Sequence, residues 1–247
     1  MKEGAKALKK DMADLEVLHR DSASLEHAIR KYDDQWHEFL PSRFVYSFFT
    51  FNTLYSVDWE KSLRTGKLVS YDDTDEKTSS NTSKEWLGEK DRYNRYLDFC
   101  FSDREFVKVY EEFFFAFIGQ SFDTRDILRE LGNIRVDEKS SGAIKKKYFI
   151  RNFYDACART LNSKTLDIDN CRTILTFIYK IRCNIFHGTK TLKELHNKSQ
   201  QKRINIYTVF LIAINQMVFS YIDYLIYEDI TYEFDSLRKD LNDKNYD

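Results

Sequence analysis

Three residues near position 185 could do chemistry together: Arg182, Asn184 and His187. An imidazole titrates near neutral pH, so His187 could act as a general base or a general acid. The planar guanidinium of Arg182 suits the oxygens of a phosphate and the negative charge that builds on them during reaction. Asn184 could orient either the phosphate or the histidine. These residue types indicate acid–base cleavage of a phosphodiester.

A helix has to position these side chains. An apolar helical pattern covers residues 167–185, and Gly188 directly follows His187, as glycine does just past many helix ends. Arg182 and His187 stand five positions apart, roughly 140° around an ideal helix. The two side chains therefore converge only if the helix ends near His187 or if a second subunit supplies the missing partner.

The motif resembles a known signature. Arg-x-x-x-x-His at a helix end, followed by glycine, resembles HEPN domains, and most closely the Apea-like branch of prokaryotic defence and toxin systems. A second stretch, residues 44–55, is similar to the aromatic early helix of that branch, with its Phe-Asn-x-Leu-Tyr ending at Tyr55. The two stretches frame residues 43–190, and the last helix extends the resemblance to about residue 228.

The resemblance implies a metal-independent endoribonuclease that acts as a toxin or anti-phage defence effector. It implies attack of a ribose 2′-hydroxyl on the adjacent phosphate, which leaves a 2′,3′-cyclic phosphate and a 5′-hydroxyl. Arg182, Asn184 and His187 would be the catalytic residues, and no cofactor or metal would be needed. Two copies would pair so that both Arg–His sets face one cleft, so we expect a homodimer.

Other interpretations stay open. A lone histidine in an apolar helix is usually a core or interface residue, and the helix dipole favours an arginine near a C-terminus in any case. Cys183 has no second histidine nearby in sequence to activate it as a nucleophile. The chain could therefore be a catalytically silent module that binds RNA or a partner protein. It could also be a toxin that an antitoxin or a sensor protein holds inactive.

Two basic stretches could contact RNA. The first follows the motif directly, and its position in sequence places it near His187. The second precedes Tyr148, and basic residues beside aromatics can hold a phosphate backbone and stack bases, although such a run can also be a solvated helix face. The candidate RNA-binding residues are Lys190, Lys193, Lys198, Lys202 and Arg203 in the first stretch and Lys145, Lys146 and Lys147 in the second.

Composition favours an all-α protein. The 247 residues include one proline and seven glycines, too few for the many turns of a β protein, and 42% are hydrophobic, which is ample for a core. The 39 basic and 40 acidic side chains nearly cancel, so a nucleic acid would have to bind a local patch. With the motif, this composition predicts a HEPN-like helical bundle.

The cysteines and the apolar segments indicate in which cellular compartment the protein is expected. Cys100, Cys157, Cys171 and Cys183 are widely and irregularly spaced, as reduced and partly buried thiols of an intracellular protein are. No apolar segment begins the chain, and the longest apolar run, near residues 209–218, contains Asn215 and Gln216 and is short for a bilayer. We expect a soluble, cytoplasmic protein without a membrane partner.

The chain divides into three parts: an N-terminal helical extension over 1–40, a HEPN-like domain over 41–230 and a charged tail over 231–247. A polar insertion is expected at about 70–84, where one aromatic residue and no aliphatic one occur. In the domain, Ser42 should cap an aromatic helix over 43–63, in which the Asn52 amide either bonds a neighbouring helix or acts directly in catalysis. Gly119 should end the helix that starts at Arg104. Further helices are predicted over 86–100, 121–133, 143–161, 167–185 and 204–228.

Overall fold

The computed structural model describes residues 1–21, 40–71, 88–136, 138–139, 142–186 and 197–230. Within these ranges the protein is helical, and its only β pairing is an isolated antiparallel bridge between Val57 and Ser70. The predicted all-α class is confirmed. The polar insertion at 70–84 and the tail at 231–247 lie almost wholly outside the described residues.

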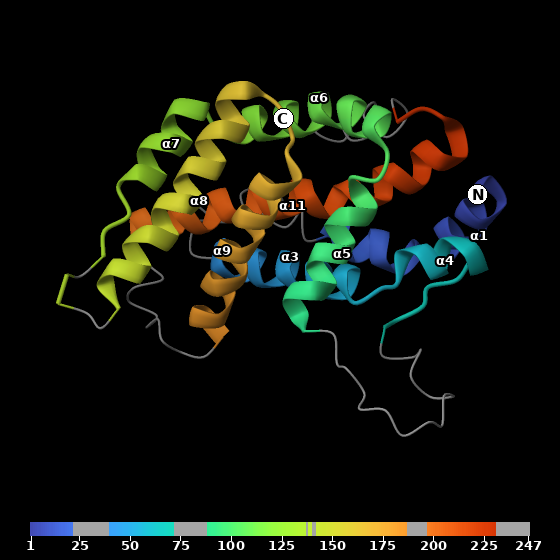
Figure 1. Cartoon of the computed structure of the whole chain (residues 1–247), viewed down its shortest axis with the longest axis horizontal. Helices are drawn as coiled ribbons and strands as arrows, with labels where there is room; N and C mark the ends of the chain where they lie inside the picture. The colour runs from blue at the N-terminus through green and yellow to red at the C-terminus, as the bar shows by residue number, and fades with distance from the viewer. Residues whose placement is uncertain (22–39, 72–87, 137, 140–141, 187–196, 231–247) are drawn as a thin grey trace, which may run out of the picture.

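The fold is built around the long helix α11 (Lys198–Tyr227), which crosses the molecule along its length (Figure 1). Its principal partner is α3 (Leu40–Tyr55), and α1 and α6 also pack on it. Buried polar groups join α3 to α11: Arg43 donates to the Asn205 Oδ1 at 3.0 Å, and the Asn215 amide donates to the Ser47 carbonyl at 3.0 Å. An amide left unbonded there would be costly, so these contacts fix how the two helices pack.

Helix α11 is long and apolar enough to cross a membrane by length and composition alone. However, 89% of its most apolar window is buried inside the fold, as in the core helix of a soluble protein. The expectation that this run is too short to span a bilayer was wrong, because the helix extends well beyond residues 209–218. Its burial against neighbouring helices accounts for its hydrophobicity.

The aromatic segment forms two helices, whereas one over 43–63 was predicted. Helix α3 begins at Leu40 and contains Pro41 in its first turn, where no helical N–H is required, so Ser42 is not its cap. It ends at Tyr55, and α4 (Trp59–Thr65) starts anew because the Asp58 carboxylate accepts from the Lys61 amide at 3.0 Å.

The first residues of the chain belong to the same hydrophobic core as the rest. Helix α1 (Lys2–Asp11) buries Ala5 and Leu8 against α4 and α11, and residues 13–21 are also helical. A Cβ atom added to Gly4 would lie 2.1 Å from the Leu63 carbonyl oxygen, so α1 and α4 touch at the backbone. Most of the second half of the expected extension, 22–39, lies outside the described residues.

Five helices follow in sequence: α5 (Glu89–Cys100), α6 (Arg104–Ser121), α7 (Thr124–Gly132), α8 (Ala143–Ser163) and α9 (Ile168–Phe186). The Asp103 and Asp123 carboxylates cap α6 and α7. Gly119 lies inside α6 rather than at its end, which corrects the prediction. Its exposed position and open surroundings make it a tolerated interior glycine.

Three helix ends meet at one end of the bundle. The Phe153 and Phe177 rings stack with centroids 3.8 Å apart, and Arg159 bonds the Asn170 amide oxygen at 2.9 Å, so α8 and α9 run antiparallel. Helix α5 is also antiparallel to α9, since its start contacts the end of α9 and its end contacts the start. The start of α8, the start of α5 and the C-terminal turn of α9 therefore lie together, at the lower end of the view in Figure 1.

Candidate functional site

Arg182 lies near the end of α9, half-buried between aromatic rings. Its guanidinium carbon is 5.2 Å from the centroid of Phe48 on α3 and 5.9 Å from the centroid of Tyr179, one turn earlier on α9. Both rings are within the range of a cation–π interaction, so they support the charged group and restrict where it points. Its Nη1 also lies 4.0 Å from the Cys183 sulfur.

The Glu89 carboxylate, in the first turn of α5, ties two tyrosines together. The Tyr179 hydroxyl donates to its Oε2, and the Tyr55 hydroxyl lies 3.4 Å from its Oε1. The Tyr55 hydroxyl also donates to the Asn52 Oδ1 at 2.5 Å. Because the carboxylate comes from a third helix, it links the ends of α3, α5 and α9.

Both phenols keep their protons well above neutral pH. The pKa of Tyr179 is raised, first by its hydrogen bond to Glu89 and then by burial. The pKa of Tyr55 is also raised, first by burial and then by the negative charge of Glu89, while the Arg182 charge acts in the opposite direction. Both tyrosines are therefore neutral, and the Tyr179 hydroxyl is the donor that holds the carboxylate in place. We call Asn52, Tyr55, Glu89, Tyr179 and Arg182 the tyrosine–arginine cluster.

The structure brings together the two stretches that carry the sequence resemblance. The Phe-Asn-x-Leu-Tyr ending of α3 supplies Asn52 and Tyr55, and the motif on α9 supplies Tyr179 and Arg182. More than 100 residues of sequence separate them, and no local pattern requires them to meet. Among the residues that the structure describes, Asn52 differs from expectation, since its Oδ1 accepts from the Tyr55 hydroxyl on its own helix and not from a group on a neighbouring helix.

Asn184 is half-buried in the last turn of α9, next to Cys183. The nearby cysteine thiol adds to the rise in the pKa of the Tyr179 phenol, after the contributions of Glu89 and burial. His187 directly follows the end of this helix and lies outside the described residues, as do Lys190 and Lys193. The prediction that Arg182 and His187 converge therefore stays a prediction.

The basic candidates at the start of α11 differ in how far their side chains are exposed to solvent. Lys198 and Lys202 are exposed at the start of α11. The Arg203 side chain is only 12% exposed and bonds the Glu130 carboxylate at 3.0 Å. A second bond, at 3.3 Å, joins it to the Asn133 carbonyl. Arg203 therefore holds α11 to α7, and its contact with RNA stays a prediction.

Lys145, Lys146 and Lys147 are exposed in the first turns of α8. The start of α8 lies beside the end of α9, so this run belongs to the same end of the molecule as Arg182. Its position in sequence gave no sign of that proximity. Lys147 is ion-paired with Glu138 at 2.7 Å, on an exposed surface where such a pair contributes little stability.

Sequence reasoning missed Glu89, the residue that links the cluster. It follows the polar insertion and opens a helix, as many surface glutamates do, so nothing in its local sequence sets it apart. The sequence gives only a weak indication of the role of Tyr179: it precedes Arg182 by one helical turn and therefore shares its helix face.

The cysteines lie apart from this chemistry, except Cys183. Cys100, Cys157 and Cys171 are buried and unpaired, and burial raises the pKa of each thiol. Such thiols are poor nucleophiles. Among the described residues, no group of three histidine, cysteine or acidic side chains is placed to hold a metal ion.

No protein-family model, no curated protein and no solved structure matches this chain. The chemistry of the cluster and the sequence motif are therefore the basis for a functional proposal.

Proposed function

We propose that this protein is a HEPN-type, metal-independent endoribonuclease that acts as a toxin or anti-phage defence effector. The observation that carries the proposal is the meeting of the two motif-bearing helices at Arg182, which rests on Phe48 and Tyr179. A guanidinium held on aromatic rings at a helix end is suited to grip a phosphate, because little side-chain freedom is lost on binding.

In this reaction His187 removes the proton of a ribose 2′-hydroxyl, and the resulting oxygen attacks the adjacent phosphorus. The bond from phosphorus to the 5′-oxygen breaks, and that oxygen takes up a proton from a general acid. Arg182 stabilises the negative charge on the phosphate oxygens in the transition state, and Asn184 orients the phosphate or the imidazole. The products are a 2′,3′-cyclic phosphate and a 5′-hydroxyl.

The general acid is the His187 of a second copy in this proposal. Arg182 and His187 are roughly 140° apart on an ideal helix, so one chain alone positions them poorly for the same phosphate. A homodimer with its symmetry axis near the ends of both α9 helices would place two Arg–His sets in one cleft. An antitoxin or a sensor protein that covers this end would keep the enzyme silent.

The test is cleavage of labelled single-stranded RNA in excess EDTA. Wild-type protein should cut, whereas His187→Ala and Arg182→Ala should lose at least about 100-fold in rate, as when a group that stabilises the transition state is removed. The matched control is Lys108→Ala, which removes an exposed charge from α6 and should cut normally. Equal background from wild type and His187→Ala, with binding retained, would identify a non-catalytic RNA-binding module instead.

A further inference from the structure

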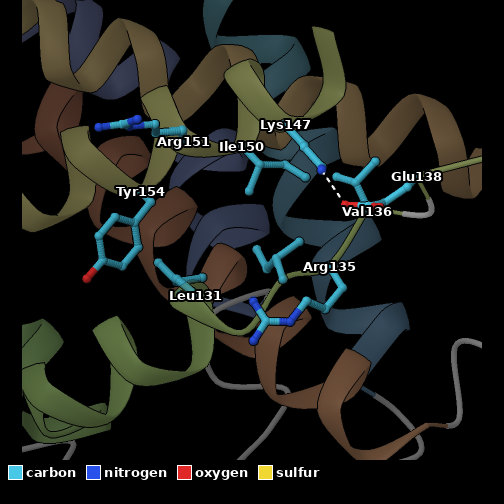
Figure 2. Close-up of a pocket in the computed structure, with 10 residues that line it drawn as sticks. Leu131, Arg135, Val136, Glu138, Lys147, Ile150, Arg151 and Tyr154 are labelled. Atoms are coloured by element: carbon cyan, nitrogen blue, oxygen red, sulfur yellow. Dashed lines mark hydrogen bonds and ion pairs between the residues drawn. The ribbon is translucent and has the colours of Figure 1, made fainter. Parts of the chain in front are cut away.

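A groove of about 600 Å³ lies between α8 and the segment that follows α7 (Figure 2). Helix α8 contributes Lys147, Ile150, Arg151 and Tyr154 to one side. The other side is formed by the end of α7 and the residues after it: Leu131, Gly132, Ile134, Arg135, Val136 and Glu138. We call this the α7–α8 groove. None of its residues belongs to the tyrosine–arginine cluster.

The groove combines an apolar floor with a basic rim. Leu131, Ile134, Val136 and Ile150 supply aliphatic surface, and the Tyr154 ring lies beside them. Three cations, Arg135, Lys147 and Arg151, and one acid, Glu138, also line the groove. An apolar surface that can take a flat ring, with cations at its edge, is complementary to a nucleobase and its flanking phosphates.

The charge of this region contrasts with the rest of the chain. Residues 133–151 contain six basic and two acidic side chains, while the whole protein has a net charge of −1. On the same stretch of α8, Ile144 and Tyr148 are 85% and 68% exposed. Exposed apolar and aromatic side chains among lysines are what a single-stranded nucleic acid can stack on.

Two of the rim cations, Lys147 and Arg151, can release their ion-pair partners and bind an anion at a small cost in free energy. Lys147 pairs with Glu138 at 2.7 Å, and Arg151 lies 3.7 Å from Asp155, with the arginine side chain 80% exposed. Exposed pairs of this kind exchange readily with an incoming anion, because each contributes at most about 1 kcal/mol. In Figure 2 the Arg151 side chain extends away from the Lys147–Glu138 pair.

The position of the groove connects it to the proposed cleavage site. Helix α8 lies between α7 and α9, and its first turns stand beside the end of α9. The groove and the end of α9 therefore lie on opposite sides of the first turns of α8, where Lys145, Lys146 and Tyr148 are exposed to a strand that spans both. We infer that the α7–α8 groove binds one nucleotide of a single-stranded RNA, outside the scissile bond, with its base on the apolar floor and its phosphates on Arg135, Lys147 and Arg151.

This inference rests on the proposed function for its connection to cleavage, but its test does not require cleavage. The probe is fluorescein-labelled hexauridylate, titrated against full-length His187→Ala protein at several salt concentrations. The double change Lys147→Glu and Arg151→Glu should weaken binding at least tenfold, since each removes a charged hydrogen bond to phosphate. The slope of log K against log salt should fall by about 1.4, or roughly 0.7 for each phosphate that is no longer neutralised.

The matched control is Lys108→Glu on α6. Lys108 is exposed and pairs with Glu105 one turn away, as Arg151 pairs with Asp155, so its reversal makes a similar local change far from the groove. It should leave hexauridylate binding within about twofold of the parent protein. A melting temperature within a few degrees of the parent would show that all the variants fold.

A second measurement locates the base. Hexanucleotides with one 4-thiouridine should cross-link on irradiation to the peptide that carries Ile150 and Tyr154. Equal binding by the double variant and by Lys108→Glu, or cross-links confined to other helices, would overturn the inference. So would uridine monophosphate binding as tightly as hexauridylate, because the groove would then be a site for free nucleotides.

The two proposals can fail separately. If the wild-type protein cuts RNA and the double variant binds and cuts like its parent, the groove inference falls and the nuclease stands. If no cleavage occurs but the double variant loses hexauridylate, the groove stands and the nuclease falls.

Discussion

The Tyr179 hydroxyl on α9 donates to the Glu89 carboxylate that opens α5. This hydrogen bond joins the helix that carries Arg182 to a helix whose start lies about 90 residues earlier in the chain. It fixes the last turns of α9 in rotation, because Tyr179 and Arg182 share one face of that helix. Tyr179 and Glu89 are thus positioning residues for the proposed nuclease.

Tyr179→Phe should lower the rate of RNA cleavage about tenfold while leaving the fold intact, because the ring stays and only the hydroxyl is removed. Glu89→Gln, which keeps an acceptor oxygen, should lose less than Glu89→Ala. If Glu89 only stabilised the fold, the Gln and Ala variants would differ in cleavage rate only as far as they differ in melting temperature. Tyr46→Phe, an exposed tyrosine on α3, is the control and should cut like wild type.

Arg182→Lys should lose at least about 100-fold in cleavage although it keeps the positive charge. Lysine has no planar fork to bind two phosphate oxygens and stacks less well on Phe48 and Tyr179. The rate should be measured under single-turnover conditions, beside Lys180→Ala on the exposed face of the same helix. A lysine variant as fast as wild type would show that Arg182 acts only as a charge.

Gly4→Ala should destabilise the protein, whereas Gly119→Ala should stabilise it. A Cβ at Gly4 would lie 2.1 Å from the Leu63 carbonyl oxygen, so α1 must move away from α4. A Cβ at Gly119 meets nothing within 4 Å, and alanine is favoured in a helix interior by about 0.5–1 kcal/mol. Urea unfolding of both variants checks the pair, and an unchanged midpoint for Gly4→Ala would argue against the close approach of α1 and α4.

Stability should fall as the pH drops from about 6.5 towards 4, in part through His19. This buried histidine bonds Gln216 at 2.9 Å and stacks on Phe219, and burial lowers its pKa to about 4. Its pKa in the unfolded chain is near 6.5, so between these values the unfolded state binds the extra proton and stability is lost. Arg20 lowers the pKa further, and the nearby Glu16 carboxyl has a raised pKa.

The His19 contribution is isolated by comparing wild type with His19→Gln. The variant should show a shallower loss of unfolding free energy between pH 6.5 and 4, by up to roughly 3 kcal/mol across the window. The measurement is urea unfolding at a series of pH values. Parallel curves for the two proteins would mean that His19 is not buried as a neutral group.

The helices could be predicted largely from sequence, because apolar periodicity and aspartate caps act locally. Helices α8 and α9 end within two residues of the predicted bounds, and α7 ends within one residue of its bound, although it begins at Thr124 rather than at residue 121. The errors concern helix boundaries that tertiary packing determines. Gly119 lies inside α6 instead of ending it, and Asp58 caps a new helix, so the aromatic segment forms α3 and α4. A glycine or an aspartate has the same local preferences whether or not a helix continues past it.

The candidate site was predictable only in part. Arg182 could be selected by its residue type and its place near a helix end, but Glu89 could not, because its role depends on α5 packing against α9. Likewise, Arg203 looks like any other basic residue after the motif. Only its pairing with Glu130 shows that it holds two helices together.

The central claim is that this protein breaks RNA by 2′-hydroxyl attack with His187 as a proton-transfer group. The most direct measurement is the chemistry of the product ends in EDTA, using an oligonucleotide with a single ribonucleotide in an otherwise 2′-deoxy chain and its all-deoxy counterpart. We predict a cut only at the ribonucleotide, with a 2′,3′-cyclic phosphate on one fragment, a 5′-hydroxyl on the other, and no cut by His187→Ala. Cleavage of the all-deoxy chain, or 5′-phosphate ends, would contradict the claim.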